Sequence, residues 1–279
     1  MTDPQEVRAD FQQMMGRPES ELDLARAALL VAAEADPALD VEREMARLED
    51  WARDLRGRLT PGMNNLQKLA RLRAYVFEDL GFDGDHQGYY SPANSLLHDV
   101  MRRRRGIPLT MAIVLLELGW RVGMPLEGVG FPGHFLVRLA GEPRDLLLDP
   151  FRDGMSVHEE DCRRMLLEST GGRVDYDHRL VASIGKRQMI ERLLLNLKSS
   201  CLRAGDDAGA LGAVERLLLL HPGDPEETRD QGLLLFRLRR YGAARQALER
   251  YLAASPAAAD RASVEAHLAR LRTLLSELN

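Results

Sequence analysis

The chain has 279 residues, a length sufficient for two domains with cores of ordinary size. Apolar residues make up 45% and charged residues 29% of it, and the formal net charge is −5. This acidic balance excludes a broad electrostatic attraction to nucleic acid or to anionic membranes, so we expect neither kind of partner. The N-terminal residues show no signal-peptide pattern, and the longest apolar stretch is too short to cross a bilayer.

The two cysteines, Cys162 and Cys201, have no metal-binding spacing. We therefore expect them to be packing residues of helices in a reduced, cytoplasmic protein. No phosphate loop, dinucleotide fingerprint or metal-ligand spacing is present, so we expect no cofactor and no metal.

Apolar residues recur at helical spacing over the first 82 residues and predict helices at 21–37, 39–59 and 64–82. Residues 83–94 are rich in turn residues and predict a loop. A short helix should follow, with Asn94 or Ser95 as its N-cap. Four consecutive arginines, residues 102–105, close it. Cations are favourable at a helix C-terminus, and we prefer that interpretation to a nucleic-acid patch.

The motif "GIPLTMA" predicts a Gly turn and a buried helix with Pro108 in its first position. The apolar period then changes from helical to two. Residues 126–131, 134–139 and 145–150 predict strands of a small antiparallel sheet. Residues 156–170 are again helical by pattern, with Ser156 as the expected N-cap and Glu159 three residues later, as in a capping box.

The last third of the chain repeats itself with an offset of 34 residues. Small residues recur at fixed points, Ala210 with Ala244 for example, and a proline closes each unit at Pro222 and Pro256. This pattern is typical of tetratricopeptide helix pairs. We expect two full repeats and a capping helix at 259–278. Such repeats commonly hold a peptide or helix, so we expect a protein or peptide partner.

His134 and Asp149 are equidistant from the predicted turn at residues 140–144. In a hairpin closing there they would be directly opposed, and their side chains would point to one face. The carboxylate could then hold the Nδ1–H of the imidazole, which is the base-orienting half of a catalytic triad. The alternative is a hydrogen-bonded pair without a functional role.

The segments "YYSPANS", "RRRRGIPLT", "GVGFPGHFLVR" and "LDPF" resemble the bacterial SirB-type family. Its members are transglutaminase-like (papain-like) domains, usually followed by tetratricopeptide repeats. The resemblance implies an α+β domain with N-terminal helices and a small antiparallel sheet, then an all-α repeat segment. We place the first domain at residues 1–182, its helical N-terminal part reaching about residue 82, and the second at 183–279.

In the wider superfamily a nucleophilic Cys opens a helix in the pattern G-x-C-x-x-x-A, a His begins one strand and an Asp ends the next. In this chain Gly106 and Ala112 match the flanks of that pattern, and His134 and Asp149 match the other two triad positions. The Cys position falls on Pro108, which has no nucleophilic atom.

We therefore expect a non-catalytic, regulatory or scaffold pseudoenzyme that binds a partner through its cleft and its repeats. Cleft residues beside the degenerate triad would be Asn94, Ser95, Gly106, Thr110 and Gly133. The alternative is a hydrolase or acyl-transfer enzyme, with water or the hydroxyl of Thr110 or Ser95 as the nucleophile. The sequence leaves the partner's identity and the oligomeric state open.

Overall fold

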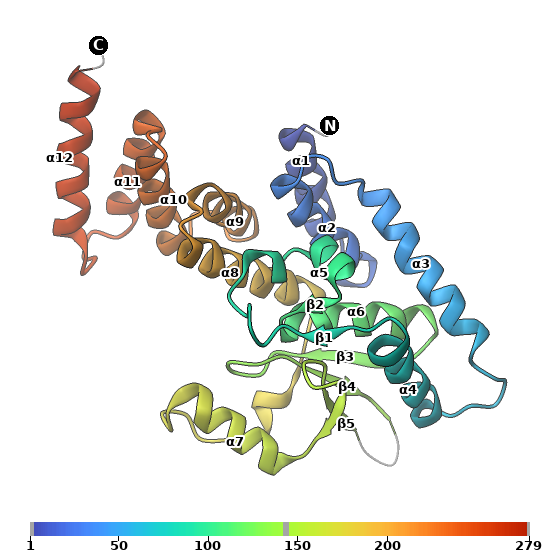
Figure 1. Ribbon diagram of the computed structural model, residues 1–279. Coiled ribbons are helices and arrows are strands. Elements are labelled where there is room, and N and C mark those ends of the chain that lie inside the picture. The colour runs from blue at the N-terminus through green and yellow to red at the C-terminus, as the bar shows by residue number, and fades with distance from the viewer. Residues whose placement is uncertain (1–2, 142–144, 278–279) are drawn as a thin grey trace. The chain divides into compact units, whose positions relative to one another are not determined.

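The computed structural model describes residues 3–141 and 145–277. The chain divides into two compact units, Met1–Leu193 and Leu194–Asn279. The expected fold class is confirmed, because helices precede a small antiparallel sheet and a run of helices follows it (Figure 1). Within the described residues, no helix has the length and apolarity needed to cross a membrane.

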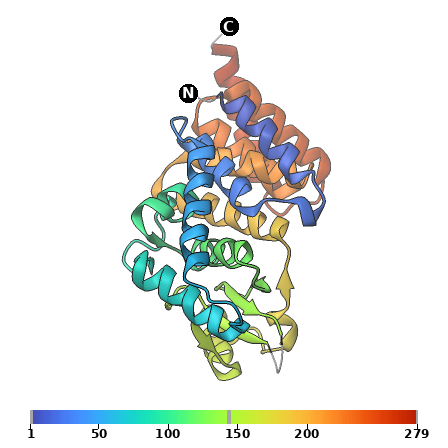
Figure 2. The same ribbon diagram turned by 90° about the vertical axis from the view of Figure 1, so that its right-hand side faces the viewer.

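The first unit begins with four helices, three of them in the predicted places. They are α1 (Pro4–Met15), α2 (Leu24–Ala35), α3 (Val41–Gly57) and α4 (Asn65–Arg73). Helix α1 was not predicted, and α4 continues as a π-helix over Ala74–Asp79. Helix α3 buries one stripe, including Leu48 and Leu55, and runs along the outside of the unit in both views (Figures 1 and 2).

Two short strands connect the loop at 83–94 to the start of the buried helix. Strand β1 (Asp83–Gly84) pairs in parallel with β2 (Arg105–Gly106), which directly precedes α6 (Pro108–Arg121). Helix α5 (Leu97–Arg103) lies between the two strands in sequence. Its N-cap is Leu96 without a side-chain hydrogen bond, so the cap predicted at Asn94 or Ser95 is wrong.

A five-stranded antiparallel sheet has the order β6-β5-β4-β3-β7. The strands are β3 (Leu126–Val129), β4 (Leu136–Leu139), β5 (Leu146–Asp149), β6 (Met155–Val157) and β7 (Ser183–Ile184). Side chains alternate between its faces. Leu126 packs closely against Gly119 of α6, while Val129, on the other face, packs with Cys162 and Leu166 of α7 (Glu159–Thr170). The sheet therefore lies between α6 and α7.

Helix α7 does not begin where its capping pattern predicted. Ser156 lies in β6, where it pairs with Leu148 of β5. The N-cap is His158, whose backbone N–H donates to Asp161 at 3.0 Å. Pairing with the sheet satisfies the backbone of residue 156, so the helix starts later.

The second unit is helical throughout its described residues. Helix α8 (Lys186–Ala204) begins in the first unit and continues into the second. It is followed by α9 (Asp207–Leu220), α10 (Pro225–Arg237), α11 (Tyr241–Ala254) and α12 (Arg261–Glu277). The recurring alanines of the repeat pattern are buried, as close helix packing requires: Ala210, Ala213, Ala244 and Ala247.

Candidate functional site around His134

His134 and Asp149 are in hydrogen-bond contact. His134 lies in the turn before β4 and Asp149 ends β5, and Nε2 of the imidazole is 2.8 Å from Oδ1 of the carboxylate. Asp149 is only 3% exposed, and the same oxygen accepts the backbone N–H of Phe151 at 2.9 Å. The backbone N–H of Phe151 therefore fixes the carboxylate that contacts the imidazole.

The hairpin register differs by two residues from the predicted one. Val137 pairs with Leu148, so continuation of the ladder sets Asp149 opposite Leu136 and not opposite His134. His134 itself lies before the ladder, in the turn that precedes β4, and its side chain reaches Asp149 from there. The predicted turn at 140–144 lies largely outside the described residues.

The ring nitrogen that contacts the carboxylate is Nε2, so the predicted contact through Nδ1 is wrong. A carboxylate only accepts, so Nε2 carries the proton in this contact. Nδ1 makes no hydrogen bond with any described residue, and the side chain of His134 is 17% exposed. When the ring is neutral, Nδ1 therefore presents a lone pair to solvent, where it can accept a hydrogen bond or a proton.

Phe151 connects this pair to the loop at 83–94. Its ring centroid lies 4.5 Å from that of His86, 5.8 Å from Tyr89 and 6.3 Å from His134. Gly84 approaches so closely that a Cβ there would lie 2.7 Å from the Phe151 ring. Since Gly84 pairs with Gly106, Phe151 also links the pair to the strand that leads into α6.

Arg192, which was not predicted as a site residue, hydrogen-bonds the backbone beside His134. Its Nη2 donates to the carbonyl of Phe131 at 2.7 Å and to that of His134 at 2.5 Å. Burial lowers the pKa of this guanidinium, while Tyr89 acts electrostatically in the opposite direction. Among the described residues, no carboxylate forms an ion pair with Arg192. No local motif marks an arginine 58 residues from its partner.

We call the six residues described above the His134 site: His86, Tyr89, His134, Asp149, Phe151 and Arg192. It contains an oriented imidazole with one free nitrogen, an aromatic surface and a guanidinium without a carboxylate partner among the described residues. Such groups can bind a polar ligand with an acidic group, or can activate water.

Residues 42–195 match the description "Transglutaminase-like superfamily", and residues 197–269 match "Tetratricopeptide repeat". The chain belongs to the transglutaminase-like superfamily. It is 35% identical over 253 residues to a UPF0162 protein of Xylella fastidiosa, with 90% of each chain covered. This architecture, with bacterial homologues of that name, confirms the SirB-type resemblance.

The chain is also 27% identical over 183 residues to F-box only protein 21 of Homo sapiens, covering 62% of this chain and 28% of that protein. A crystal structure of menin aligns with 91% of this chain and 71% of its own, at 12% identity and a TM-score of 0.43.

Pro108 occupies the first position of α6, as the Pro preference of that position predicted, and it is buried. The two thiols of the chain are also buried. Burial raises the pKa of Cys162 to about 11 and that of Cys201 to about 12, so both stay protonated near neutral pH. Thiolate chemistry therefore has no support from either cysteine.

Thr110 and Ser95, the two candidate hydroxyl nucleophiles, are both buried and cannot serve as exposed nucleophiles. Thr110 is fully buried, donates to the carbonyl of Asn94 at 2.8 Å and accepts the N–H of Ile107 at 3.1 Å. It caps α6, as threonines in a first helical turn often do. Ser95 is 2% exposed.

Asn94 organises the loop at 83–94 and does not cap a helix. Its amide donates to the carbonyl of Gly88 at 2.7 Å and to Asp85 at 3.1 Å, and it accepts from Arg103 at 2.7 Å. Asp85 in turn accepts the N–H of Gly88 at 2.7 Å. Asn94 thereby fixes the segment that carries His86 and Tyr89.

The two candidate glycines are required for packing. A Cβ at Gly106 would lie 2.6 Å from the Thr110 hydroxyl. Gly133 has φ +71°, a conformation that favours glycine, and a Cβ there would lie 2.4 Å from Ser169. Both residues shape the site without offering it a functional group.

The four consecutive arginines do not present a common basic surface, because each engages a neighbour. The contacts are Arg102 with Asp99, Arg103 with Asn94, Arg104 over the ring of Trp51 and Arg105 with Asp83. Within the described part of the chain, no group of three or more His, Cys, Asp or Glu side chains is arranged to hold a metal ion.

Proposed function

We propose that this protein is a non-catalytic member of its superfamily, a regulatory or scaffold protein that binds a protein or peptide partner. The His134 site and the repeats would supply the binding surfaces, and residues 1–182 and 183–279 would act as the two functional domains. Tetratricopeptide repeats generally mediate contacts between proteins, which supports this role for the second domain.

Pro108 is the observation that carries the proposal. The superfamily's acyl-transfer chemistry needs a thiolate at the start of a helix beside an imidazole. Here the helix opens on proline, both cysteines are buried and protonated, and the nearby hydroxyl of Thr110 is engaged as a cap. An oriented histidine remains, and its orientation is useful for binding as well as for catalysis.

The chemistry of the His134 site favours a peptide segment with an acidic group. Nδ1 of His134 can accept a hydrogen bond, Arg192 can pair with a carboxylate, and the rings of Tyr89 and Phe151 can pack against apolar atoms. A bound carboxylate would also offset the desolvation cost of the Arg192 guanidinium, which is partly buried and has no acidic partner among the described residues.

A substrate screen tests the non-catalytic assignment. The purified wild-type chain and a His134→Ala variant are incubated with amide, ester and glutaminyl substrates, and product release is followed. We expect no turnover above the variant's background. Turnover by the wild type that the variant lacks would contradict the proposal.

Hydrolysis by a His134-activated water is the second candidate, and the free Nδ1 of an Asp-oriented imidazole favours it. The same screen decides between the two functions. A Pro108→Cys variant adds a sharper comparison, because it places a thiol at the first position of α6 and leaves the six residues of the His134 site unchanged. Activity in Pro108→Cys but not in the wild type would show that proline alone blocks catalysis.

A further inference from the structure

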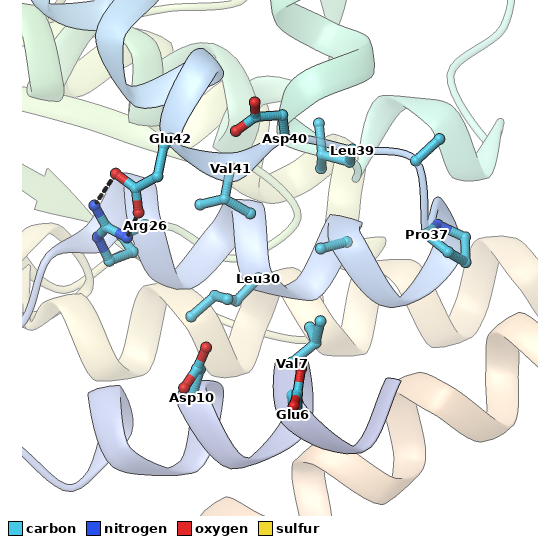
Figure 3. Close-up of a pocket in the computed structure, with 12 residues that line it drawn as sticks. Glu6, Val7, Asp10, Arg26, Leu30, Pro37, Leu39, Asp40, Val41 and Glu42 are labelled. Carbon is cyan, nitrogen blue, oxygen red and sulfur yellow. Dashed lines mark hydrogen bonds and ion pairs between the residues drawn. The ribbon is translucent and has the colours of Figure 1, made fainter. Parts of the chain in front are cut away.

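A pocket lies between the first three helices, and none of its residues belongs to the His134 site. Its volume is about 500 Å³. The lining comes from α1, from α2, from the connection that follows it and from the first turn of α3: Glu6, Val7, Asp10, Arg26, Leu30, Ala33 and residues 37–42 (Figure 3). Nearly all of these residues precede the superfamily match, which begins at residue 42.

Apolar side chains form part of the pocket's lining. Val7, Leu30 and Ala33 line it with 3%, 6% and 2% of their surfaces exposed, and Leu39 and Val41 are half-buried at its side (Figure 3). A volume of this size accommodates one or two large apolar side chains. The pocket thus has room for anchor residues of a partner.

The rim is acidic. Four carboxylates and one guanidinium line the pocket. That guanidinium, Arg26, is neutralised by Glu42 through two hydrogen bonds of 2.5 and 2.9 Å, which Figure 3 shows as dashed lines. Asp40 accepts the N–H of Arg43 as the N-cap of α3.

Glu6 and Asp10 carry the remaining acidic charge, and Asp10 also acts electrostatically on Arg26. Both are exposed, and neither forms an ion pair with a described residue. They are four residues apart on α1 and therefore lie side by side, which disfavours the isolated helix when both are charged. A cation placed over them from outside would remove that repulsion.

We propose that this pocket, which we call the α1–α3 pocket, binds a basic amphipathic helix of a protein partner. Apolar side chains of the partner would enter the pocket, and its Lys or Arg side chains would lie over Glu6 and Asp10. This is the helix-in-groove mode of recognition. The arginine run at 102–105 is not the occupant from a second copy, since its four side chains are already engaged.

The probe is a fluorescein-labelled amphipathic peptide of leucine and lysine, and binding to the full chain is followed by fluorescence anisotropy at about 0.15 M salt. A peptide with serine in place of leucine has the same charge and tests the apolar contribution. We expect the leucine peptide to bind at least tenfold more tightly than the serine peptide.

The pocket variant is the double substitution Glu6→Lys and Asp10→Lys. Glu160→Lys with Glu168→Lys, on exposed positions of α7, makes the same change in net charge and is the matched control. We expect the leucine peptide to bind the pocket variant about tenfold more weakly, and the control variant within about twofold of wild type. The milder pair Glu6→Gln and Asp10→Asn should give an intermediate loss without adding repulsion.

The proposal would be overturned by no binding of the leucine peptide, by equal losses in the pocket and control variants, or by unchanged binding in both pocket variants. Analytical ultracentrifugation of the chain without peptide measures whether it self-associates. A dimer that dissociates in the pocket variant would assign the pocket to a second copy of the chain and not to a basic partner.

Discussion

A single oxygen of Asp149 accepts two hydrogen bonds, from the His134 ring and from the backbone of Phe151. The Asp149→Ala substitution leaves both donors without their acceptor in a largely buried place. We expect the free energy of unfolding to fall by about 2 kcal/mol, measured by urea denaturation. Asp175→Ala, at an exposed position, should change it by less than about 0.5 kcal/mol. Equal losses of stability in the two variants would mean that Asp149 does not accept these two hydrogen bonds.

His98 provides a test of pH dependence away from the candidate site. Its side chain is 9% exposed, Nδ1 has no partner among the described residues, and Nε2 lies 3.7 Å from Asp36 and 3.8 Å from Asp99. Burial lowers the pKa of His98 below its ordinary 6.5, and Arg102 adds to this effect, while Asp99, Asp36 and Glu44 oppose it.

Because its pKa is lower when folded, His98 binds its proton more readily in the unfolded chain. Stability from this group is complete above pH 6.5 and is lost as the pH falls below it. The slope is at most about 1.4 kcal/mol per pH unit. Urea denaturation between about pH 5.5 and 7.5 should show a smaller slope for His98→Gln than for wild type. His178→Gln, with an 82% exposed side chain, is the control, and an equal slope in all three proteins would refute this role of His98.

For individual residues, the sequence predicted which side chains are in contact but not which of their atoms form the hydrogen bond. Spacing and a family motif brought His134 and Asp149 together, and the structure has them in contact. Which ring nitrogen contacts Asp149 depends on the backbone turn before β4, and the periodicity of apolar residues carries no information about that turn. Arg192 was missed because its partners are carbonyl oxygens, which every residue carries and which therefore leave no signal in a sequence.

Among the elements, the strands were predictable because alternation survives small errors of register. The two-residue shift in the β4–β5 hairpin leaves His134 and Asp149 in contact, whereas a shift of one would have moved every β4 side chain to the other face of the sheet. The start of α7 was not predictable in the same way. The residues around Ser156 fit a capping box locally. The pairing of β6 with β5, a tertiary contact, places Ser156 in a strand and moves the start of α7 to Glu159.

Packing between elements predicts opposite outcomes for two glycines. A Cβ at Gly84 would lie 2.7 Å from the ring of Phe151 and 2.9 Å from its carbonyl oxygen, whereas a Cβ at Gly57, the last residue of α3, would meet no atom within 4 Å outside its chain neighbours and its own helix backbone. Gly84→Ala should lower the free energy of unfolding by about 1–3 kcal/mol through overpacking. Gly57→Ala should raise it by up to about 1 kcal/mol through helix propensity. Thermal or urea denaturation of both variants measures the difference, and a stable Gly84→Ala would mean that Phe151 is not fixed beside β1.

For the whole molecule, the repeat period was the most reliable signal, because each pair of helices must bury the same small residues against its neighbours. Helices α9, α10 and α11 follow the pattern read from the sequence. The N-terminal helix α1 has no such repetition and was missed. It forms one wall of the α1–α3 pocket, so the sequence could not have indicated that surface either.

The two compact units predict separable unfolding signals. Lys198 is a partly buried cation of the second unit, with Nζ 2.8 Å from Glu227 and 2.6 Å from Asp230. In the Lys198→Met variant the Glu227 carboxylate loses its counter-ion, while Asp230 keeps a hydrogen bond from Arg229. We expect a loss of roughly 3 kcal/mol, near the lower limit for a broken buried pair.

Both tryptophans of the chain, Trp51 and Trp120, lie in the first unit, so their fluorescence reports on that unit, while far-UV circular dichroism reports on both. Lys198→Met should therefore shift part of the dichroism transition to lower temperature and leave the fluorescence transition in place. Asp149→Ala should give the reverse pattern, because its site belongs to the first unit. If both signals shift together in both variants, the units unfold as one cooperative body, and the stability of the His134 site then depends on the repeats.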